Sequence, residues 1–219
     1  MRLALFDLDH TLIPFDSGTA WTRHLVARGA LPADAERRHL EFCHQYVAGT
    51  LDIHAMHHAL IAPLAGVDPD ELRAWREEFA QAMASHLSPA LRERVERHRE
   101  RGDLCAIVTA TSRLVAEPFA RALAIEHLVA TEPVLVDGRP SGAIAGRPCY
   151  REHKVTRVGE WLDRLGAPPL AACEESWFYS DSISDLALLQ CVTHPVAVRP
   201  DPRLREQCRI AGWPVLDEP

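Results

Sequence analysis

The sequence predicts an α/β fold: a doubly wound, Rossmann-like parallel sheet with an all-helical segment inserted after its first strand. Three observations support this prediction. Short, continuously apolar runs, typical of strands buried on both faces of a parallel sheet, occur at residues 3–6, 104–108, 177–179 and 196–198. Helical patterns separate these runs, as strand–helix alternation requires. The region from residue 16 to residue 86 contains no strand-like run at all.

Helices are expected between the later strands, at residues 88–102, 151–165 and 183–190. The first of them has a well-marked start, because Ser88 suits an N-cap and Pro89 suits the first helical position. A β-hairpin is expected within residues 134–146, because the Asp137-Gly138 pair favours a two-residue turn.

We call the region 16–86 the cap. Its pattern of apolar residues predicts a bundle of roughly four helices. Its apolar residues recur at three- and four-residue steps, as in Leu72, Trp75, Phe79 and Met83. Breaks at residues 29–32, 49–50 and 65–69 divide it. We therefore expect a core formed by residues 1–15 and 87–219 and a cap formed by residues 16–86. A cap inserted there would lie above the carboxyl ends of the strands, where open α/β sheets bind ligands.

The composition limits the classes of partner. The net charge is −7 with histidine neutral, and no long basic block occurs, so we expect neither nucleic acid nor a membrane as primary partner. The first apolar run is too short for a signal sequence, and no run reaches the ~18 residues of a membrane span. The six cysteines are scattered without a C-x-x-C pair, which predicts reduced thiols and a cytoplasmic location.

Four polar features follow predicted strands or open a predicted helix. They are Asp7-x-Asp9-x-Thr11, Thr109, Lys154, and the pair Asp181 and Asp185. Taken singly, each has an ordinary structural explanation: a turn, an N-cap, a solvated helix residue or carboxylates at a helix start. Because the carboxyl ends of parallel strands share one edge, their order and placement favour a common site instead.

In this order the four features resemble the motifs of the haloacid dehalogenase superfamily of phosphohydrolases. The resemblance covers essentially the whole chain, including a helical cap between the first and second motifs. Within the superfamily the chain is most similar to subfamily IB, the branch of phosphoserine phosphatases and histidinol-phosphatase-like proteins. The phrases that carry this finer likeness are VTATSRLVAEP, ATEP and YSDSISDLALL.

The resemblance implies a catalytic role for each motif, and elementary chemistry agrees with it. Asp7 would be the nucleophile, forming an aspartyl-phosphate that splits hydrolysis into two steps. Asp9 would protonate the leaving alcohol and then deprotonate water. Thr109 would donate a hydrogen bond to the phosphoryl group, and Lys154 would offset its negative charge.

A metal cofactor, Mg²⁺, follows from the same charges. Four carboxylates and a nearly dianionic ester carry roughly −6 against +1 from Lys154, which is unfavourable in a partly dry cleft. Oxygen ligands suit Mg²⁺ best. The resemblance implies Asp7, the backbone carbonyl of Asp9, and Asp181 as ligands, with Asp185 and Thr11 in support.

The cap is expected to choose the substrate, a small soluble phosphate ester such as histidinol phosphate or phosphoserine. Asp16 falls where the phosphoserine phosphatases carry an acidic residue that binds the substrate amine. A gapless match places His58 where they carry an arginine, and Ala110 stands where they have glycine after the second motif. His58 shares helical spacing with His54 and His57; the three suit the polar face of a cap helix, and no Cys, Asp or Glu completes a zinc site with them at a recognisable spacing.

Two alternatives to a phosphatase keep the same residue types. A phosphotransferase of the same family would use the same motifs. A phosphorylatable signalling module of the receiver type also clusters Asp, Thr or Ser, and Lys on a doubly wound sheet. Receivers, however, are shorter, place the phosphorylated Asp on a later strand and lack a ~70-residue helical insert.

Overall fold

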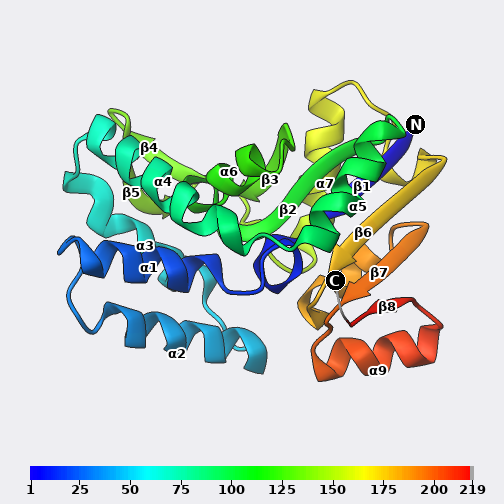
Figure 1. Cartoon of the computed structure of the whole chain (residues 1–219), viewed down its shortest axis with the longest axis horizontal. Helices are drawn as coiled ribbons and strands as arrows, with labels where there is room; N and C mark the ends of the chain where they lie inside the picture. The colour runs from blue at the N-terminus through cyan, green and yellow to red at the C-terminus, as the bar shows by residue number, and fades with distance from the viewer. Residues whose placement is uncertain (218–219) are drawn as a thin grey trace.

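The computed structural model describes residues 1–217 and contains a six-stranded parallel sheet (Figure 1). The strand order is β3-β2-β1-β6-β7-β8, so the first strand lies in the middle. The strands are β1 Arg2–Phe6, β2 Leu104–Ser112, β3 His127–Thr131, β6 Glu175–Ser180, β7 His194–Val198 and β8 Val215–Leu216. The predicted fold class is confirmed. All four predicted strands exist, whereas β3 and the two-residue β8 were not predicted.

The two faces of the sheet carry separate hydrophobic cores, which explains why β1 is apolar without alternation. Leu3 and Leu5 face one core, and Ala4 and Phe6 face the other. The first core contains α7 His153–Arg164, α8 Leu186–Leu189 and α9 Pro202–Ala211, and the second contains α5 Pro89–Glu100 and α6 Arg113–Ala122. The predicted helix 183–190 is shorter than expected, because a 3₁₀ turn at Ile183–Asp185 precedes α8.

Four helices follow β1, as predicted for the cap (Figure 1). They are α1 Ser17–Ala27, α2 Ala35–Ala48, α3 Ile53–Ile61 and α4 Pro69–Met83, with short 3₁₀ turns at Ala62–Gly66 and Ala84–His86. Three of these helices begin with an aspartate side chain that accepts backbone N–H groups, at Asp16, Asp52 and Asp68. The division into a core and a cap at the predicted boundaries stays a prediction.

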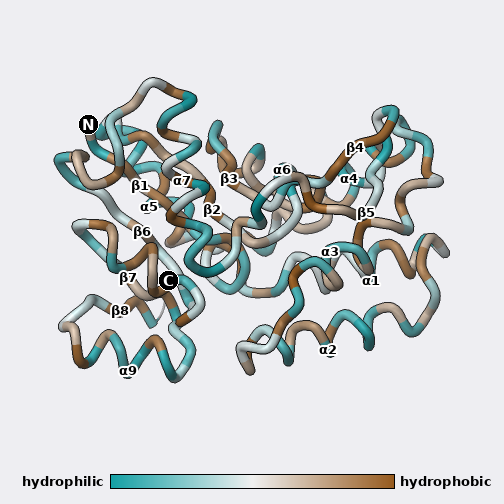
Figure 2. The backbone as a smooth tube through the Cα atoms, turned by 180° about the vertical axis from the view of Figure 1, so that it is seen from behind, coloured by the Kyte–Doolittle hydropathy of each residue, from teal (hydrophilic) through white to brown (hydrophobic). Residues whose placement is uncertain are grey.

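The predicted hairpin exists as β4 Pro133–Val136 and β5 Arg139–Ile144, and it packs on the cap (Figure 2). The Nδ1 atom of His57 lies 3.0 Å from the carbonyl oxygen of Gly142, and Arg139 donates to the carbonyl of Val67 at 2.6 Å. A Cβ atom at Gly142 would lie 2.6 Å from the Cβ of Ala62, so only glycine permits this contact. The hairpin, which follows β3 in the chain, thus packs against α3 and the 3₁₀ turn of the cap.

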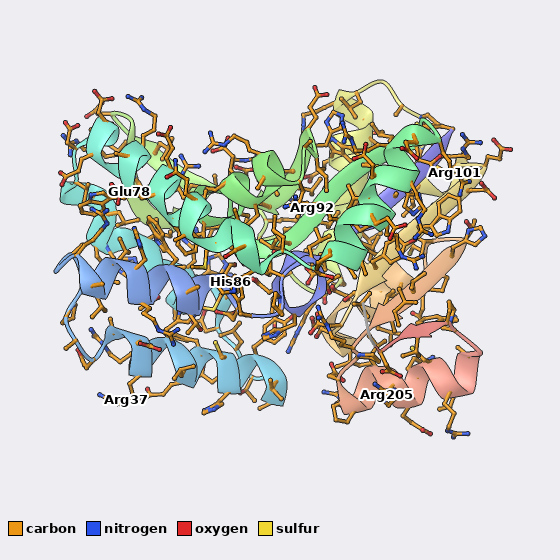
Figure 3. The ribbon with its side chains drawn as sticks, viewed as in Figure 1. Arg37, Glu78, His86, Arg92, Arg101 and Arg205 are labelled. Carbon is orange, nitrogen blue, oxygen red and sulfur yellow. The ribbon has the colours of Figure 1, made fainter. Side chains whose placement is uncertain are left out.

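Charged side chains such as Arg37, Arg101 and Arg205 lie exposed at the surface of the molecule (Figure 3). All six cysteines are free thiols, and four of them are buried. Between residues 1 and 217, no helix has the length and apolarity that crossing a membrane requires.

An aromatic cluster fixes the cap to the helix layer of the sheet. Phe79 on α4 is 1% exposed and meets the rings of Trp21 on α1 and Phe119 on α6 edge-on, with centroids 5.1 and 5.6 Å away. Beside it, Arg76 of α4 donates to the carbonyl of Leu114 at 2.7 Å. Edge-to-face packing of this kind adds to the hydrophobic burial of each ring.

Replacing Phe79 by Ala should therefore lower the free energy of unfolding by about 3–5 kcal/mol, because the substitution leaves a cavity between α1, α4 and α6. Chemical denaturation measures the change. The matched control is Val47→Ala on α2, whose side chain is 75% exposed and which should change stability by less than about 0.5 kcal/mol. Equal effects of the two substitutions would contradict the packing described here.

Candidate active site

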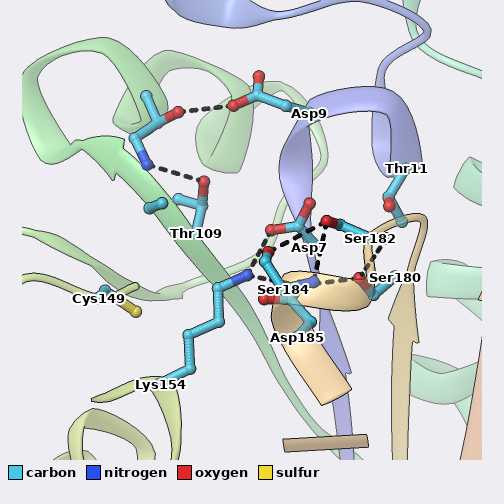
Figure 4. Close-up of polar contacts among 12 residues, drawn as sticks. Asp7, Asp9, Thr11, Thr109, Cys149, Lys154, Ser180, Ser182, Ser184 and Asp185 are labelled. Atoms are coloured by element: carbon cyan, nitrogen blue, oxygen red, sulfur yellow. Dashed lines mark hydrogen bonds and ion pairs between the residues drawn. The ribbon is translucent and has the colours of Figure 1, made fainter. Parts of the chain in front are cut away.

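Side chains from three neighbouring strands meet at the carboxyl edge of the sheet (Figure 4). Asp7 follows β1, Thr109 lies on β2, and Asp181 follows β6. The backbone N–H of Asp7 donates to the carbonyl of Tyr179 at 2.9 Å, so strand pairing extends to the first carboxylate and fixes its position. Motifs that are far apart in the sequence thus lie close together, because β1 lies between β2 and β6.

Lys154, in the first turn of α7, bridges two of the carboxylates (Figure 4). Its Nζ atom donates to Asp7 Oδ1 at 2.8 Å and to Asp185 Oδ2 at 2.7 Å, and the side chain is 1% exposed. Ser180 also donates to Asp185 Oδ2 at 2.7 Å. Burial alone would lower the pKa of Lys154, but the charges of Asp185 and Asp7 raise it well above its ordinary value.

Lys154 is the only lysine in the chain, which otherwise uses arginine for its basic residues. An ammonium is compact and can donate to two carboxylates in a buried space, whereas a guanidinium needs a wider, planar site. The residue type at this position therefore follows from the space between Asp7 and Asp185.

The site nevertheless holds more negative charge than Lys154 can balance. Burial, opposed by Lys154 and reinforced by Asp185 and Asp9, raises the pKa of Asp7 to about 7. Burial and the charges of Asp7 and Asp185 raise the pKa of Asp181 well above its ordinary value. Among residues 1–217, the buried Oδ1 atom of Asp185 has no hydrogen-bond partner. Buried oxygen donors with surplus negative charge fit a Mg²⁺ ion.

Asp9 lies two residues after Asp7, but its carboxylate is held by other groups. Its Oδ2 accepts from the hydroxyl of Thr111 at 2.6 Å, and its Oδ1 accepts from the backbone N–H of Ser17 at 2.7 Å. Burial and the charge of Asp16 raise the pKa of Asp9, while the bonds from Ser17 and Thr111 oppose the rise. The carboxylate is thus positioned jointly by β2 and the start of α1, and the raised pKa favours the protonated form that a general acid needs.

The remaining predicted residues of the core motifs also reach this site. Thr109 is buried, and its hydroxyl accepts from the backbone N–H of Thr111 at 3.1 Å. Thr11 donates to Asp181 Oδ1 at 3.3 Å. A cavity of about 120 Å³ is bordered by Asp7, Asp9, His10, Asp16, Cys43, Tyr46, Met56, Thr109, Ala110, Thr111 and Asp181. Two of the predicted substrate residues, Asp16 and Ala110, therefore line it.

The structure does not bring His58 to this cavity. Met56 of α3 borders the cavity, and a residue two positions further points roughly 200° around the helix. His58 is exposed and borders a separate cavity of about 530 Å³. His54 is also exposed, as a polar helix face predicts, whereas His57 is buried against Gly142.

Several residues of the site were not found by sequence reasoning. Thr111 was missed because its role depends on a hydrogen bond to Asp9, and the sequence does not show that the Asp9 side chain points towards it. Tyr46, His39 and Cys43 lie on α2, at three- and four-residue spacing that marks one helix face. The hydroxyl of Tyr46 hydrogen-bonds the hydroxyl of Ser184, so α2 contacts the loop between Asp181 and Asp185. The helical spacing was the available signal, but it could not show which face meets the core.

A family model settles the class of protein to which this site belongs. The model for haloacid dehalogenase-like hydrolases matches residues 4–190. The chain belongs to this family. The predicted resemblance and the predicted enzyme class, a phosphatase of the haloacid dehalogenase-like family, are confirmed.

Two curated relatives and one solved structure extend the comparison. A histidinol-phosphatase of Neisseria meningitidis is 37% identical over 219 residues, covering 99% of this chain and 98% of the relative. A phosphoserine phosphatase of Mycobacterium tuberculosis, SerB1, is 30% identical, covering 98% of this chain and 70% of the relative. A crystal structure from Bordetella pertussis, of a protein with unknown function, is 44% identical with a TM-score of 0.91, covering 99% of this chain and 98% of that one.

Replacing Lys154 by Met should abolish turnover, by at least about 100-fold, because a buried cation that faces developing phosphoryl charge is lost. It should also lower the free energy of unfolding of the metal-free protein by about 3–5 kcal/mol, since two buried carboxylates lose their partner. Aryl phosphate hydrolysis and denaturation measure the two effects. Arg164→Met, an exposed position on the same helix, is the control. Activity retained in Lys154→Met would contradict the role of the bridge.

Replacing Thr111 by Val should lower kcat about 10-fold, the effect of one lost hydrogen bond to the group that exchanges the proton. KM should change little, because the phosphate-facing groups remain. Thr111→Ser keeps the hydroxyl and should retain the wild-type rate. Steady-state kinetics of the three proteins measure kcat and KM, and equal rates for the Val and Ser variants would show that the Thr111 hydroxyl does not assist Asp9.

Proposed function

We propose that the protein is a Mg²⁺-dependent phosphomonoesterase that acts on a small soluble phosphate ester through an aspartyl-phosphate on Asp7. The observation that carries this proposal is that the two carboxylates of one motif have different hydrogen-bond partners. Asp7 is paired with Lys154 at the strand end, while Asp9 is held by Thr111 and Ser17 in the same cavity. One carboxylate is thus placed to attack, and the other to exchange a proton.

The chemistry of the chain's own groups follows from these positions. A carboxylate oxygen of Asp7 attacks phosphorus, and the bond from phosphorus to the ester oxygen breaks. Asp9 gives its proton to the leaving alcohol and then takes one from the water that hydrolyses the aspartyl-phosphate. The ammonium of Lys154 and the hydroxyl of Thr109 reduce the charge on the phosphoryl oxygens.

The residues that would hold Mg²⁺ are Asp7, Asp181 and the backbone carbonyl of Asp9, with Asp185 as an outer partner. The unpartnered Oδ1 of Asp185 and the raised pKa of Asp181 support this ligand set. Bound there, the ion would offset the charge of the carboxylates and of the phosphate.

We further propose that the substrate carries an amine or imidazole but no carboxylate, as histidinol phosphate does. Four aspartates border the cavity, whereas no arginine does so among residues 1–217. A carboxylate-bearing substrate such as phosphoserine would therefore meet repulsion without the bidentate partner that recognition of a carboxylate normally uses. Asp16 supplies a counter-charge for a cationic group, and the relative from Neisseria meningitidis bears a histidinol-phosphatase name.

A cytoplasmic location is proposed on separate grounds. All six cysteines are free, and four are buried in the described part of the chain. Unpaired buried thiols are typical of proteins from reducing compartments.

The test measures release of inorganic phosphate from histidinol phosphate, phosphoserine and an aryl phosphate, with and without a chelator. We expect kcat/KM for histidinol phosphate to exceed that for phosphoserine at least 10-fold, about 1.4 kcal/mol. Chelation and Asp7→Asn should both abolish turnover, whereas Asp70→Asn, at an exposed position of α4, should not. A phosphotransferase would instead pass phosphate to an added alcohol.

Three outcomes would contradict the proposal. A preference for phosphoserine would overturn the substrate. Activity that survives chelation would overturn the metal, and activity that survives Asp7→Asn would overturn the nucleophile.

A further inference from the structure

A second group of metal-ligand side chains lies in the cap, on the wall of the same cavity. Asp16 caps α1, and His39 and Cys43 lie one turn apart on α2. One ligand atom from each, a carboxylate oxygen, a ring nitrogen and the Cys43 sulfur, lies within 4.8 Å of the others. The Nε2 atom of His39 is 3.1 Å from Asp16 Oδ1. We propose that these three side chains bind a Zn²⁺ ion.

The donor set separates this site from the one at Asp7. Carboxylate, imidazole and thiolate donors are the ligands of protein zinc sites, whereas the site at Asp7 offers oxygen alone. Tetrahedral zinc places its ligand atoms about 3.3–3.8 Å apart, so shifts of roughly 1 Å would close the cluster around an ion. Ionised Asp16 and Cys43 would balance the charge of Zn²⁺, so in the zinc-loaded protein a nitrogen group of the substrate would meet the open zinc position instead of a free Asp16 carboxylate.

The contact between Asp16 and His39 is built into the backbone. A Cβ atom at residue 18 would lie 2.7 Å from His39 Nε2 and 3.3 Å from Asp16 Oδ1, so Gly18 makes room for the ring. Gly18 is the second residue of α1, and in a helix interior glycine costs up to about 1 kcal/mol relative to alanine. The backbone N–H of Thr19 orients the Asp16 carboxylate by donating to Oδ1 at 2.6 Å. Close approach of the ring therefore accounts for a residue that the helix disfavours.

The cluster also faces space that a ligand can enter. Asp16 and Cys43 border the cavity that contains Asp7 and Asp9, and Asp16 and His39 border an adjoining cavity of about 30 Å³. Three protein ligands leave the fourth zinc position open, as in catalytic zinc sites. That position would take water or a nitrogen donor from a molecule in the cavity.

Cobalt substitution tests the site directly, because a thiolate bound to Co²⁺ gives a charge-transfer absorption that oxygen ligands do not give. The metal-free wild-type protein should show this band on titration with Co²⁺, and Zn²⁺ should abolish it. The band should vanish in Cys43→Ser and persist in Cys191→Ser, which changes an exposed cysteine. The affinity for Zn²⁺, measured by competition with a chromogenic chelator, should fall more than about 10-fold in His39→Gln, since even outer-shell losses reach that size.

Asp7→Asn separates this proposal from the proposed function, because it should lose phosphatase activity and keep the cobalt band. Circular dichroism establishes that each variant is folded. If His39→Gln does not fold, Cys43→Ser decides alone. Absence of the band in the wild-type protein, or its survival in Cys43→Ser, would overturn the zinc site and leave an ion pair between Asp16 and His39.

Discussion

The rest of the site depends on the bridge that Lys154 forms between Asp7 and Asp185. Three segments that are distant in sequence, the end of β1, α7 and the turn before α8, meet there, with Lys154 and Asp185 each 1% exposed and Asp7 bordering the cavity. One buried ammonium makes two buried carboxylates tolerable, but it cannot also balance Asp181. Three carboxylates therefore share one ammonium at the strand ends, where a bound cation would stabilise their ionised forms.

The cap contributes to the chemistry as well as to access. The first turn of α1 holds Asp9 through Ser17, and Tyr46 of α2 reaches Ser184 in the loop after Asp181. The aromatic contacts of Phe79 keep α4 on α6. The cap is packed on α6 through α4 and hydrogen-bonded to the active site through α1 and α2. Its residues therefore border the same cavity as the group that is proposed to transfer the proton.

The parts that sequence predicted best are those with a strong local cause. Unbroken apolar runs gave the buried strands, and carboxylates at strand ends gave the core site, because parallel strands share an edge. Prediction failed where tertiary contacts decide. β3 has an apolar run of only three residues, and β8 has two residues in all. The orientation of Asp9 depends on Thr111, which is 102 positions away. The gapless placement of His58 ignored the direction in which α3 turns its side chains, and Cys43 joins His39 and Asp16 only once α2 packs beside α1.

Binding of Mg²⁺ tests the central claim, a surplus of buried negative charge beyond what Lys154 balances, without reference to any substrate. The melting temperature should be measured with and without Mg²⁺ for the wild-type protein and for Asp181→Asn. We expect saturating Mg²⁺ to raise the melting temperature of the wild-type protein by several degrees, the effect of about 1–3 kcal/mol of binding linkage. Asp181→Asn should lose most of this rise. A melting temperature that Mg²⁺ leaves unchanged, or raises equally in both proteins, would contradict the central claim.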